Sequence, residues 1–183
     1  KVRNENPHLY DVYFATRRVQ DAEIKYYLPS TPKKLSIKII DSKKRIVLEK
    51  EGVLNPKSDD DSPSWFGTDN KNPTMNSGLN SYKWNLRYQG ARDFEGMIIW
   101  SAKPTLGPIA PPGEYKVQLT VDDKMFESFF EVRKDPRITV SDSIINEQFN
   151  FAMSIMMQTD LANKSVIEIR EIKEKLYDLL SSS

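Results

Sequence analysis

The residues whose types could support chemistry lie close together in one short segment. Asp93 and Glu95 flank Phe94, and two carboxylates are the minimum for glycoside hydrolysis. Arg87 and Arg92 lie in the same segment, and a cluster of ion pairs explains these four charges more simply. Spacing within a loop does not set the separation between carboxylates that hydrolysis requires. We therefore predict no catalytic residue in this chain.

The same segment also suggests a binding surface. Aromatic rings stack on sugars and on cations, and guanidinium groups bind carboxylates. The candidate ligand-binding side chains are Arg87, Tyr88, Arg92, Phe94, Trp65 and Trp100. The alternative is that the aromatic rings pack beneath the loop while the arginines bind loop carbonyls, since Trp is more often buried than displayed.

The sequence gives no support to a metal site or a cofactor. Asp59, Asp60 and Asp61 are consecutive, but they lack the alternating oxygen ligands and the glycine of a calcium loop, so we expect a solvated acidic turn. His8 is the single histidine, which excludes a histidine-based metal site or catalytic triad. Cysteine is absent, so disulfides and thiolate sites are excluded too.

The charge balance limits the classes of partner. The chain has 27 basic and 26 acidic residues and a formal net charge of +1. This balance gives no reason to expect a nucleic acid or a membrane surface as partner. No apolar run approaches the ~18 residues needed to cross a bilayer. The chain starts at Lys1 without an apolar leader, so we expect a processed chain or a fragment that lacks a signal peptide.

Proline and glycine divide the sequence into two parts, because all 11 prolines and all 7 glycines lie at or before Pro136. Alternation of apolar and polar residues in the first part predicts strands over 22–28, 35–40, 45–50, 81–88, 114–121 and 125–132. We expect a mainly β protein, an antiparallel β-sandwich of about seven strands with Trp84, Tyr115 and Phe130 in its core. The predicted units are an N-terminal arm over 1–21, the sandwich over 22–136 and a long surface insertion over 52–80 within it.

The remaining part, 137–183, has a helical period. Ser141 or Asp142 can cap the helix, and Met153 and Met156 are expected to fasten it to the sandwich. One apolar seam is predicted through Ile145, Phe149, Ala152, Met156, Thr159, Ala162, Val166, Ile169, Ile172 or Lys173, Leu176 and Leu180. The segment 160–164 interrupts this seam, and we favour one long helix over a helical hairpin. The stripe is longer than a small sandwich can cover, so the rest is expected to pack on a partner or a second copy.

Several segments occur together and in order: AEIKYYLP, LSIKIIDSKKRIV, NSYKWNLRYQGA, GMIIWSA, GPIAPPGEYKVQLT and FEVRKDPR. Together they resemble the C-terminal Ig-like domain of bacterial sortilin-type β-propeller proteins with Asp-box (BNR) repeats, often labelled glycosyl hydrolases. The Trp-bearing strand, the Pro-Pro-Gly turn and the Tyr-bearing strand are also similar to the Ig-like domain of flagellar hook-capping proteins. The resemblance spans 22–180 and implies an immunoglobulin-like or fibronectin III-like sandwich followed by a C-terminal helical segment.

The resemblance implies a non-catalytic accessory or interaction domain of a larger exported bacterial protein, located outside the cytoplasm. Its expected partner is the neighbouring β-propeller or another protein, and self-association through the C-terminal helix is a further possibility. The chain has neither a propeller repeat nor an Asp-box motif, so the hydrolase label does not carry over as an activity. The alternatives are a carbohydrate-binding module that uses Trp65, Trp100 and Tyr88, and a glycoside hydrolase.

Overall fold

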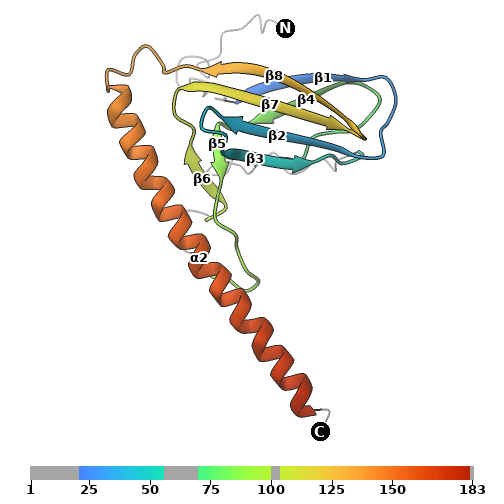
Figure 1. The fold of residues 1–183 in the computed structure, drawn as a ribbon, viewed down its shortest axis with the longest axis vertical. Coiled ribbons are helices and arrows are strands. Elements are labelled where there is room, and N and C mark those ends of the chain that lie inside the picture. The colour runs from blue at the N-terminus through green and yellow to red at the C-terminus, as the bar shows by residue number, and fades with distance from the viewer. Residues whose placement is uncertain (1–20, 56–69, 100–103, 182–183) are drawn as a thin grey trace, which may run out of the picture.

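The computed structural model describes residues 21–55, 70–99 and 104–181 (Figure 1). Within these ranges the protein is mainly β, with antiparallel sheets and one C-terminal helix, which is consistent with a β-sandwich. The elements are β1 (Ala22–Leu28), β2 (Leu35–Asp41), β3 (Ile46–Glu51), β4 (Gly78–Trp84), β5 (Arg87–Gln89), β6 (Leu106–Ile109), β7 (Gly113–Val121), β8 (Lys124–Val132) and α2 (Asp142–Ser181).

The described strands form three sheets. The largest has the order β3-β2-β7-β8, and β1 pairs with β4 in a second sheet that packs against it. A small third sheet joins β5 to β6 at the end of the sandwich that faces the helix (Figure 1). The interior between the two larger sheets holds the core.

Period-2 alternation explains why these segments are strands with one buried face. Along β2 the side chains of Leu35, Ile37 and Ile39 are buried, and the residues between them are partly exposed. Burial of each such side chain contributes roughly 1.5–3 kcal/mol relative to exposure. Ile37 lies opposite Leu119 of β7, so both central strands direct apolar side chains to the same interior.

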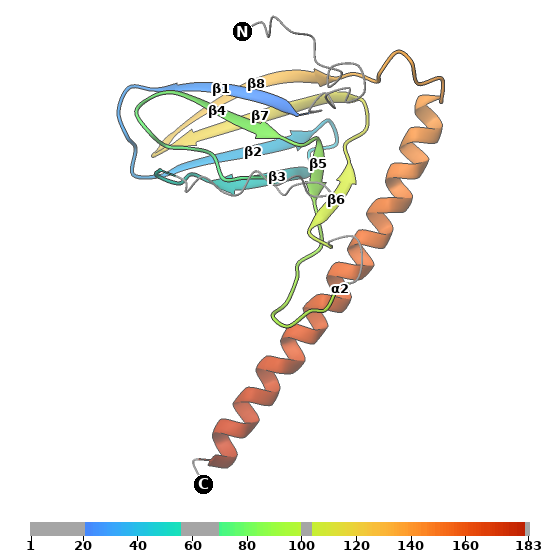
Figure 2. The same cartoon turned by 180° about the vertical axis from the view of Figure 1, so that it is seen from behind.

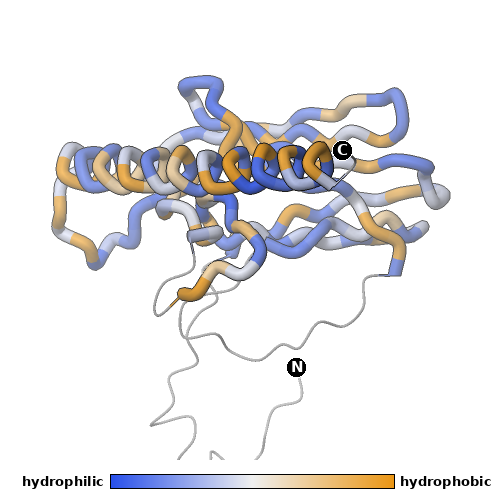
Figure 3. The backbone as a smooth tube through the Cα atoms, turned by 90° about the horizontal axis from the view of Figure 1, so that it is seen from below, coloured by the Kyte–Doolittle hydropathy of each residue, from blue (hydrophilic) through white to orange (hydrophobic). Residues whose placement is uncertain are grey.

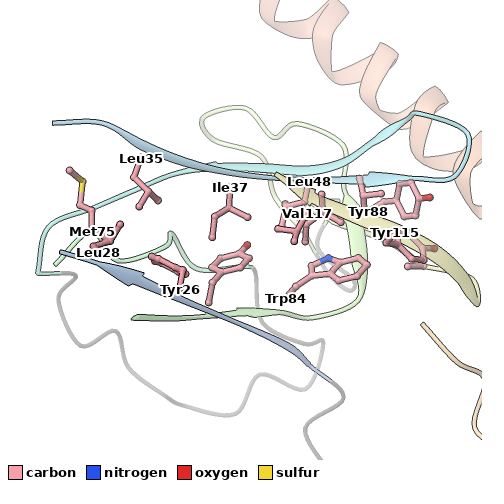
Figure 4. Packing of buried hydrophobic residues seen from close by; sticks show 14 of the residues in the cluster. Tyr26, Leu28, Leu35, Ile37, Leu48, Met75, Trp84, Tyr88, Tyr115 and Val117 are labelled. Atoms are coloured by element: carbon pink, nitrogen blue, oxygen red, sulfur yellow. The ribbon is translucent and has the colours of Figure 1, made fainter. Parts of the chain in front are cut away.

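Trp84 lies in the core, as the sequence predicts. Its side chain is fully buried, and Figure 4 shows its ring beside that of Tyr115. The centre of the Trp84 ring lies 5.5 Å from that of Tyr115 and 6.0 Å from that of Phe130. The indole nitrogen donates a hydrogen bond to the carbonyl of Arg87 at 2.9 Å. Tyr115 is buried, and its hydroxyl donates to the carbonyl of Pro111 at 2.7 Å.

The prediction of one strand over 81–88 is wrong in its extent. The chain pairs with β1 up to Trp84, turns at Leu86 with a φ of 56°, and then forms β5 in a different sheet. A turn of this kind has no local marker here, because Leu rarely adopts positive φ. The β5 strand pairs with β6, a strand that the alternation pattern did not predict.

The prediction of a surface insertion over 52–80 also needs correction at its ends. Val53 and Thr74 form an isolated parallel bridge, and Met75 is buried in the core. The last three residues of the range belong to β4. Asn80 is buried there and accepts a hydrogen bond from the Thr74 hydroxyl at 2.6 Å. This part of the insertion is therefore built into the sandwich; the part over 56–69 lies outside the described residues, as does most of the arm predicted over 1–21.

The C-terminal segment is one helix, α2, which passes through 160–164 without a break. The Ser141 hydroxyl accepts a hydrogen bond from the amide of Ile144 at 3.4 Å, which satisfies a free donor of the first turn. The first half of α2 runs beside β6 and the chain that follows β5, and the second half extends away from the sheets (Figures 1 and 2).

Candidate functional site

The junction between the sandwich and α2 is organised around Asp41, a buried carboxylate at the end of β2. One carboxylate oxygen accepts the amides of Lys43 and Arg45 at 2.9 and 2.8 Å. The other accepts the Arg45 guanidinium at 2.6 Å and the Tyr88 hydroxyl at 2.9 Å. Burial opposes the charge of Asp41, but the bonds from Arg45 and Tyr88 outweigh it and hold the Asp41 pKa below its ordinary value.

Tyr88, a candidate ligand-binding residue, is part of this buried cluster rather than of a displayed surface. Its side chain is buried, and its ring lies 4.9 Å from that of Phe149 on α2. The Arg45 guanidinium covers both rings, 5.7 Å from the centre of Tyr88 and 5.3 Å from that of Phe149. A cation held over two aromatic faces strengthens the junction. Tyr88 therefore anchors the helix to the sandwich.

Arg92 makes the second connection to α2. Its guanidinium binds the Asp160 carboxylate through two hydrogen bonds of 2.8 and 3.0 Å, and its backbone amide donates to the same group at 2.9 Å. These bonds hold the pKa of Asp160 below its ordinary value. Asn163, which is buried on α2, donates its side-chain amide to the Arg92 carbonyl at 2.6 Å. The loop and the helix are thus joined by both backbone and side chain.

Phe94 contacts α2 at Arg170, about two helical turns beyond Asn163. The Arg170 guanidinium lies 4.8 Å from the centre of the Phe94 ring and donates to the Glu95 carbonyl at 2.6 Å. The ion-pair cluster expected among Arg87, Arg92, Asp93 and Glu95 is not what the structure shows for Arg92, because its acidic partner is Asp160. Spacing within the loop could not reveal this partner, since it is 68 residues away.

Arg87 lies apart from this contact, at the edge of a small cavity. Its guanidinium donates to the Gly107 carbonyl of β6 at 2.9 Å, in line with the expectation that an arginine holds a loop carbonyl. The cavity has a volume of about 150 Å³ and lies between β3, β5 and β6. It is lined by Lys50, Asn70, Asn85, Arg87, Tyr88, Gln89, Thr105, Leu106 and Gly107. This space could accept a small polar molecule at most.

The structure brings three of the six candidate binding residues toward α2. Tyr88, Arg92 and Phe94 contact residues of the helix, and Arg87 faces the cavity instead. Trp65 and Trp100 lie outside the described residues. The acidic run over 59–61 and His8 also fall outside them. In the described ranges, no three His, Cys, Asp or Glu side chains gather in a way that could hold a metal ion.

The chain matches no protein-family model, no curated protein and no solved structure. Its function is therefore inferred from the geometry of its own residues.

The apolar seam predicted from the sequence combines residues from two different faces of α2. Ile145, Phe149, Ala152 and Met156 face the sandwich and are buried or half-buried, and Met153 packs against the core. From Glu168 to the end of α2, in contrast, every described residue is exposed. The exposed large apolar side chains of α2 are Ile144, Phe151, Ile155, Met157, Leu161, Ile169, Ile172, Leu176, Tyr177, Leu179 and Leu180.

Two further surfaces complete the candidate sites. An open groove of about 710 Å³ follows the junction and is lined by Gln89, Gly90, Arg92, Met156, Met157, Gln158, Asp160, Leu161 and Lys164. Strand β8 ends the largest sheet and exposes Met125, Phe126 and Phe129.

Among the described residues no helix combines the length and the apolar character needed to cross a membrane. Hydrophobic residues recur along the whole length of α2 (Figure 3), and exposed large apolar side chains continue to Leu180.

Proposed function

We propose that this chain is a non-catalytic interaction domain that presents α2 to a protein partner. The observation that carries the proposal is the second half of α2, where Ile169, Ile172, Leu176 and Leu180 are all more than half exposed. Soluble proteins rarely expose contiguous apolar surface of this extent unless it forms an interface. The junction around Asp41 and Arg92 holds the first half of the helix, so the second half projects in a defined direction.

The proposed setting is a larger exported bacterial β-propeller protein, as the sequence resemblance implies. The strand order β3-β2-β7-β8 opposite β1-β4 supports an Ig-like assignment, because immunoglobulin variable-type sandwiches place a C′-C-F-G sheet opposite a sheet that contains B and E. The hydrogen bond from Tyr115 to the Pro111 carbonyl supports it too, since a tyrosine near the start of strand F makes a similar bond in such domains. Trp84 differs, because it lies on β4 rather than on the strand equivalent to C.

The proposal can be tested with single-cysteine variants, because the chain has no cysteine of its own. Any cysteine elsewhere in the full-length native gene product is first replaced by serine. A photoreactive group attached to Leu176→Cys is then expected to form adducts with the neighbouring β-propeller or with another protein partner. The same group attached to Tyr27→Cys is the control, because Tyr27 is also a large, mostly exposed side chain and lies on β1, away from α2. Adducts of equal yield from both positions, or none from position 176, would contradict the proposal.

A carbohydrate-binding module remains the alternative, and it depends on Trp65 and Trp100, because buried Tyr88 offers no exposed ring face. Retardation on glycan gels that disappears in Trp65→Ala or Trp100→Ala would favour this alternative. A glycoside hydrolase is the less favoured hypothesis, and it requires the isolated chain to turn over glycosides through Asp93 and Glu95. We expect no turnover across a broad substrate panel.

A further inference from the structure

Six of the exposed large apolar residues of α2 lie on one heptad series. Steps of four and three residues, repeated without interruption, connect Phe151, Ile155, Gln158, Ala162, Ser165, Ile169, Ile172, Leu176 and Leu179. Each of these nine residues is exposed. We call them the outer seam. They are distinct from the buried residues that hold α2 to the sandwich, such as Phe149 and Met153.

The spacing indicates the shape of the surface that the outer seam fits. A repeat of 3.5 residues keeps an apolar stripe facing a second helix, whose side chains then fit between its own. The second half of the outer seam is apolar at four successive positions: Ile169, Ile172, Leu176 and Leu179. Gln158 and Ser165 make the first half more polar, so the contact is expected to be centred on the second half.

The amount of exposed surface is sufficient for a specific contact. The fractional exposure of Ile169, Ile172, Leu176 and Leu179 lies between 55% and 66%. Phe151, Ile155 and Leu180 add three more exposed apolar side chains. If each of the seven contributes on the order of 100 Å², α2 offers roughly 700–800 Å² of apolar area. This is close to the ~800 Å² that each partner contributes in a standard interface. A helical partner of similar length could cover this area.

Two of the three charged residues that flank the second half of the outer seam are positive, and the third is Glu168. With the outer seam at the a and d positions of the heptad, Lys173 and Lys175 occupy the flanking e and g positions. Glu171, Glu174 and Asp178 lie at the remaining positions, away from the contact face. Residues at e and g determine partner choice in helix pairs, so two flanking lysines favour acidic residues on the partner.

A second copy of this chain offers only part of that complement. In a parallel pair of α2 helices, Glu168 would face Lys173 of the other copy, five residues further along, although its carboxylate also lies 3.5 Å from the Lys164 ammonium of its own helix. By the same rule Lys175 would face Leu180 of the other copy. Self-association therefore leaves a lysine in the contact without an acidic neighbour.

We propose that the outer seam of α2 pairs with an amphipathic helix whose apolar stripe is flanked by acidic residues. This inference rests on the proposed function, because it names the kind of partner that the interaction domain takes. The pairing would bury the second half of the outer seam and place Lys173 and Lys175 beside carboxylates of the partner.

Two synthetic peptides can test the pairing in solution with the complete chain. Both peptides carry Ile and Leu at the a and d positions of several heptads; one has Glu at every e and g position, and the other has Lys. We expect the Glu peptide to bind at least about tenfold more tightly than the Lys peptide in calorimetric titrations at low salt. The double variant Lys173→Glu, Lys175→Glu is expected to reverse this preference.

Matched single variants show whether the peptide binds the outer seam or the opposite face of α2. Ile172→Asn should abolish binding of the Glu peptide, and Glu174→Gln should leave it unchanged. Circular dichroism of each variant checks that α2 is retained. Three outcomes would overturn the inference. The two peptides could bind equally, or neither could bind. The wild-type chain could also sediment as a dimer that is lost in Ile172→Asn.

Failure of this inference can be distinguished from failure of the proposed function. If neither peptide binds while the probe at position 176 still forms adducts with the β-propeller or another protein partner, α2 docks on a surface other than an acidic helix. In that case the proposed function is retained and the helical partner is rejected. If adducts at position 176 are also absent, both are rejected.

Discussion

Arg92 and Asp160 form a three-bond contact between the loop after β5 and the middle of α2. The guanidinium contributes bonds of 2.8 and 3.0 Å, and the backbone amide contributes one of 2.9 Å. Two parallel bonds between guanidinium and carboxylate fix direction as well as distance. This contact helps to set the direction in which α2 leaves the sandwich, together with the Arg170 bond to the Glu95 carbonyl.

Loss of the Asp160 charge is expected to loosen the loop without unfolding the sandwich. In Asp160→Asn, amides of 90–97 and of the middle of α2 should exchange with deuterium faster, while amides of β7 keep their protection. Glu171→Gln is the control, because it removes a carboxylate from the same helix at an exposed position. Unchanged exchange over 90–97 in Asp160→Asn would show that the contact does not hold the loop.

Phe149 and Phe151 are expected to differ sharply in their contribution to stability. Phe149 is 5% exposed and packs on Tyr88, whereas Phe151 is 68% exposed on the outer seam. We expect Phe149→Ala to lower the free energy of unfolding by about 3–5 kcal/mol, because it leaves a cavity at the junction. Phe151→Ala should change it by no more than about 0.5 kcal/mol. Urea denaturation measures both, and equal losses would contradict the orientation of α2.

Asp41 is expected to make the stability of the junction depend on acid pH. Its pKa in the folded protein is lower than the ordinary value of about 3.9, so its stabilisation is complete above that pH. It is lost as the pH falls through the folded-state pKa. The difference in unfolding free energy between wild type and Asp41→Asn should therefore be largest near neutral pH, on the order of 2 kcal/mol, and shrink in acid. A difference that is constant with pH would show that the charge is unimportant.

Buried tyrosines are expected to limit stability in alkali. Burial raises the pKa of Tyr115 to about 12, and it also raises the pKa of Tyr82 and of Tyr88 above the ordinary value. These groups stabilise the folded state fully below about pH 10, the ordinary tyrosine pKa, and this contribution disappears as the pH rises through the folded-state values. Unfolding free energies measured from pH 9 upward should fall, and Tyr115→Phe should reduce that fall. Ionisation of all tyrosines near pH 10 without unfolding would contradict their burial.

Local patterns in the sequence predicted most of the strands and the centre of the core. Alternation places β1, β2, β7 and β8 within a residue or so of their observed bounds. For β1, β2 and β7 it succeeds because each strand has one face in the core, so its side chains alternate between apolar and polar. In β8 only Phe130 and Val132 pack against the core. Trp84 and Tyr115 were predicted in the core from the same alternation, and both are buried.

Elements without such a period were missed. The chain turns at Leu86 through a positive φ that a leucine does not indicate in the sequence, so β4 and β5 were predicted as one strand. The polar residues near the end of the predicted insertion include a hydrogen-bonded pair, half-buried Thr74 and buried Asn80. Composition suggests solvent exposure for such residues, whereas contact with β1 and β4 decides their burial.

Local sequence patterns are sufficient to predict a β part with alternating strands and a long helix with more apolar residues than a small sandwich can cover. The role of the arginine-rich loop and the identity of the free face of the helix depend on long-range packing. Arg92 meets Asp160 across 68 residues, and Arg170 meets Glu95 across 75. Contacts over such separations depend on how the sheets and α2 are placed in space, so no local period encodes them. Once they are formed, one stripe of α2 is covered by the sandwich and the outer seam is left exposed.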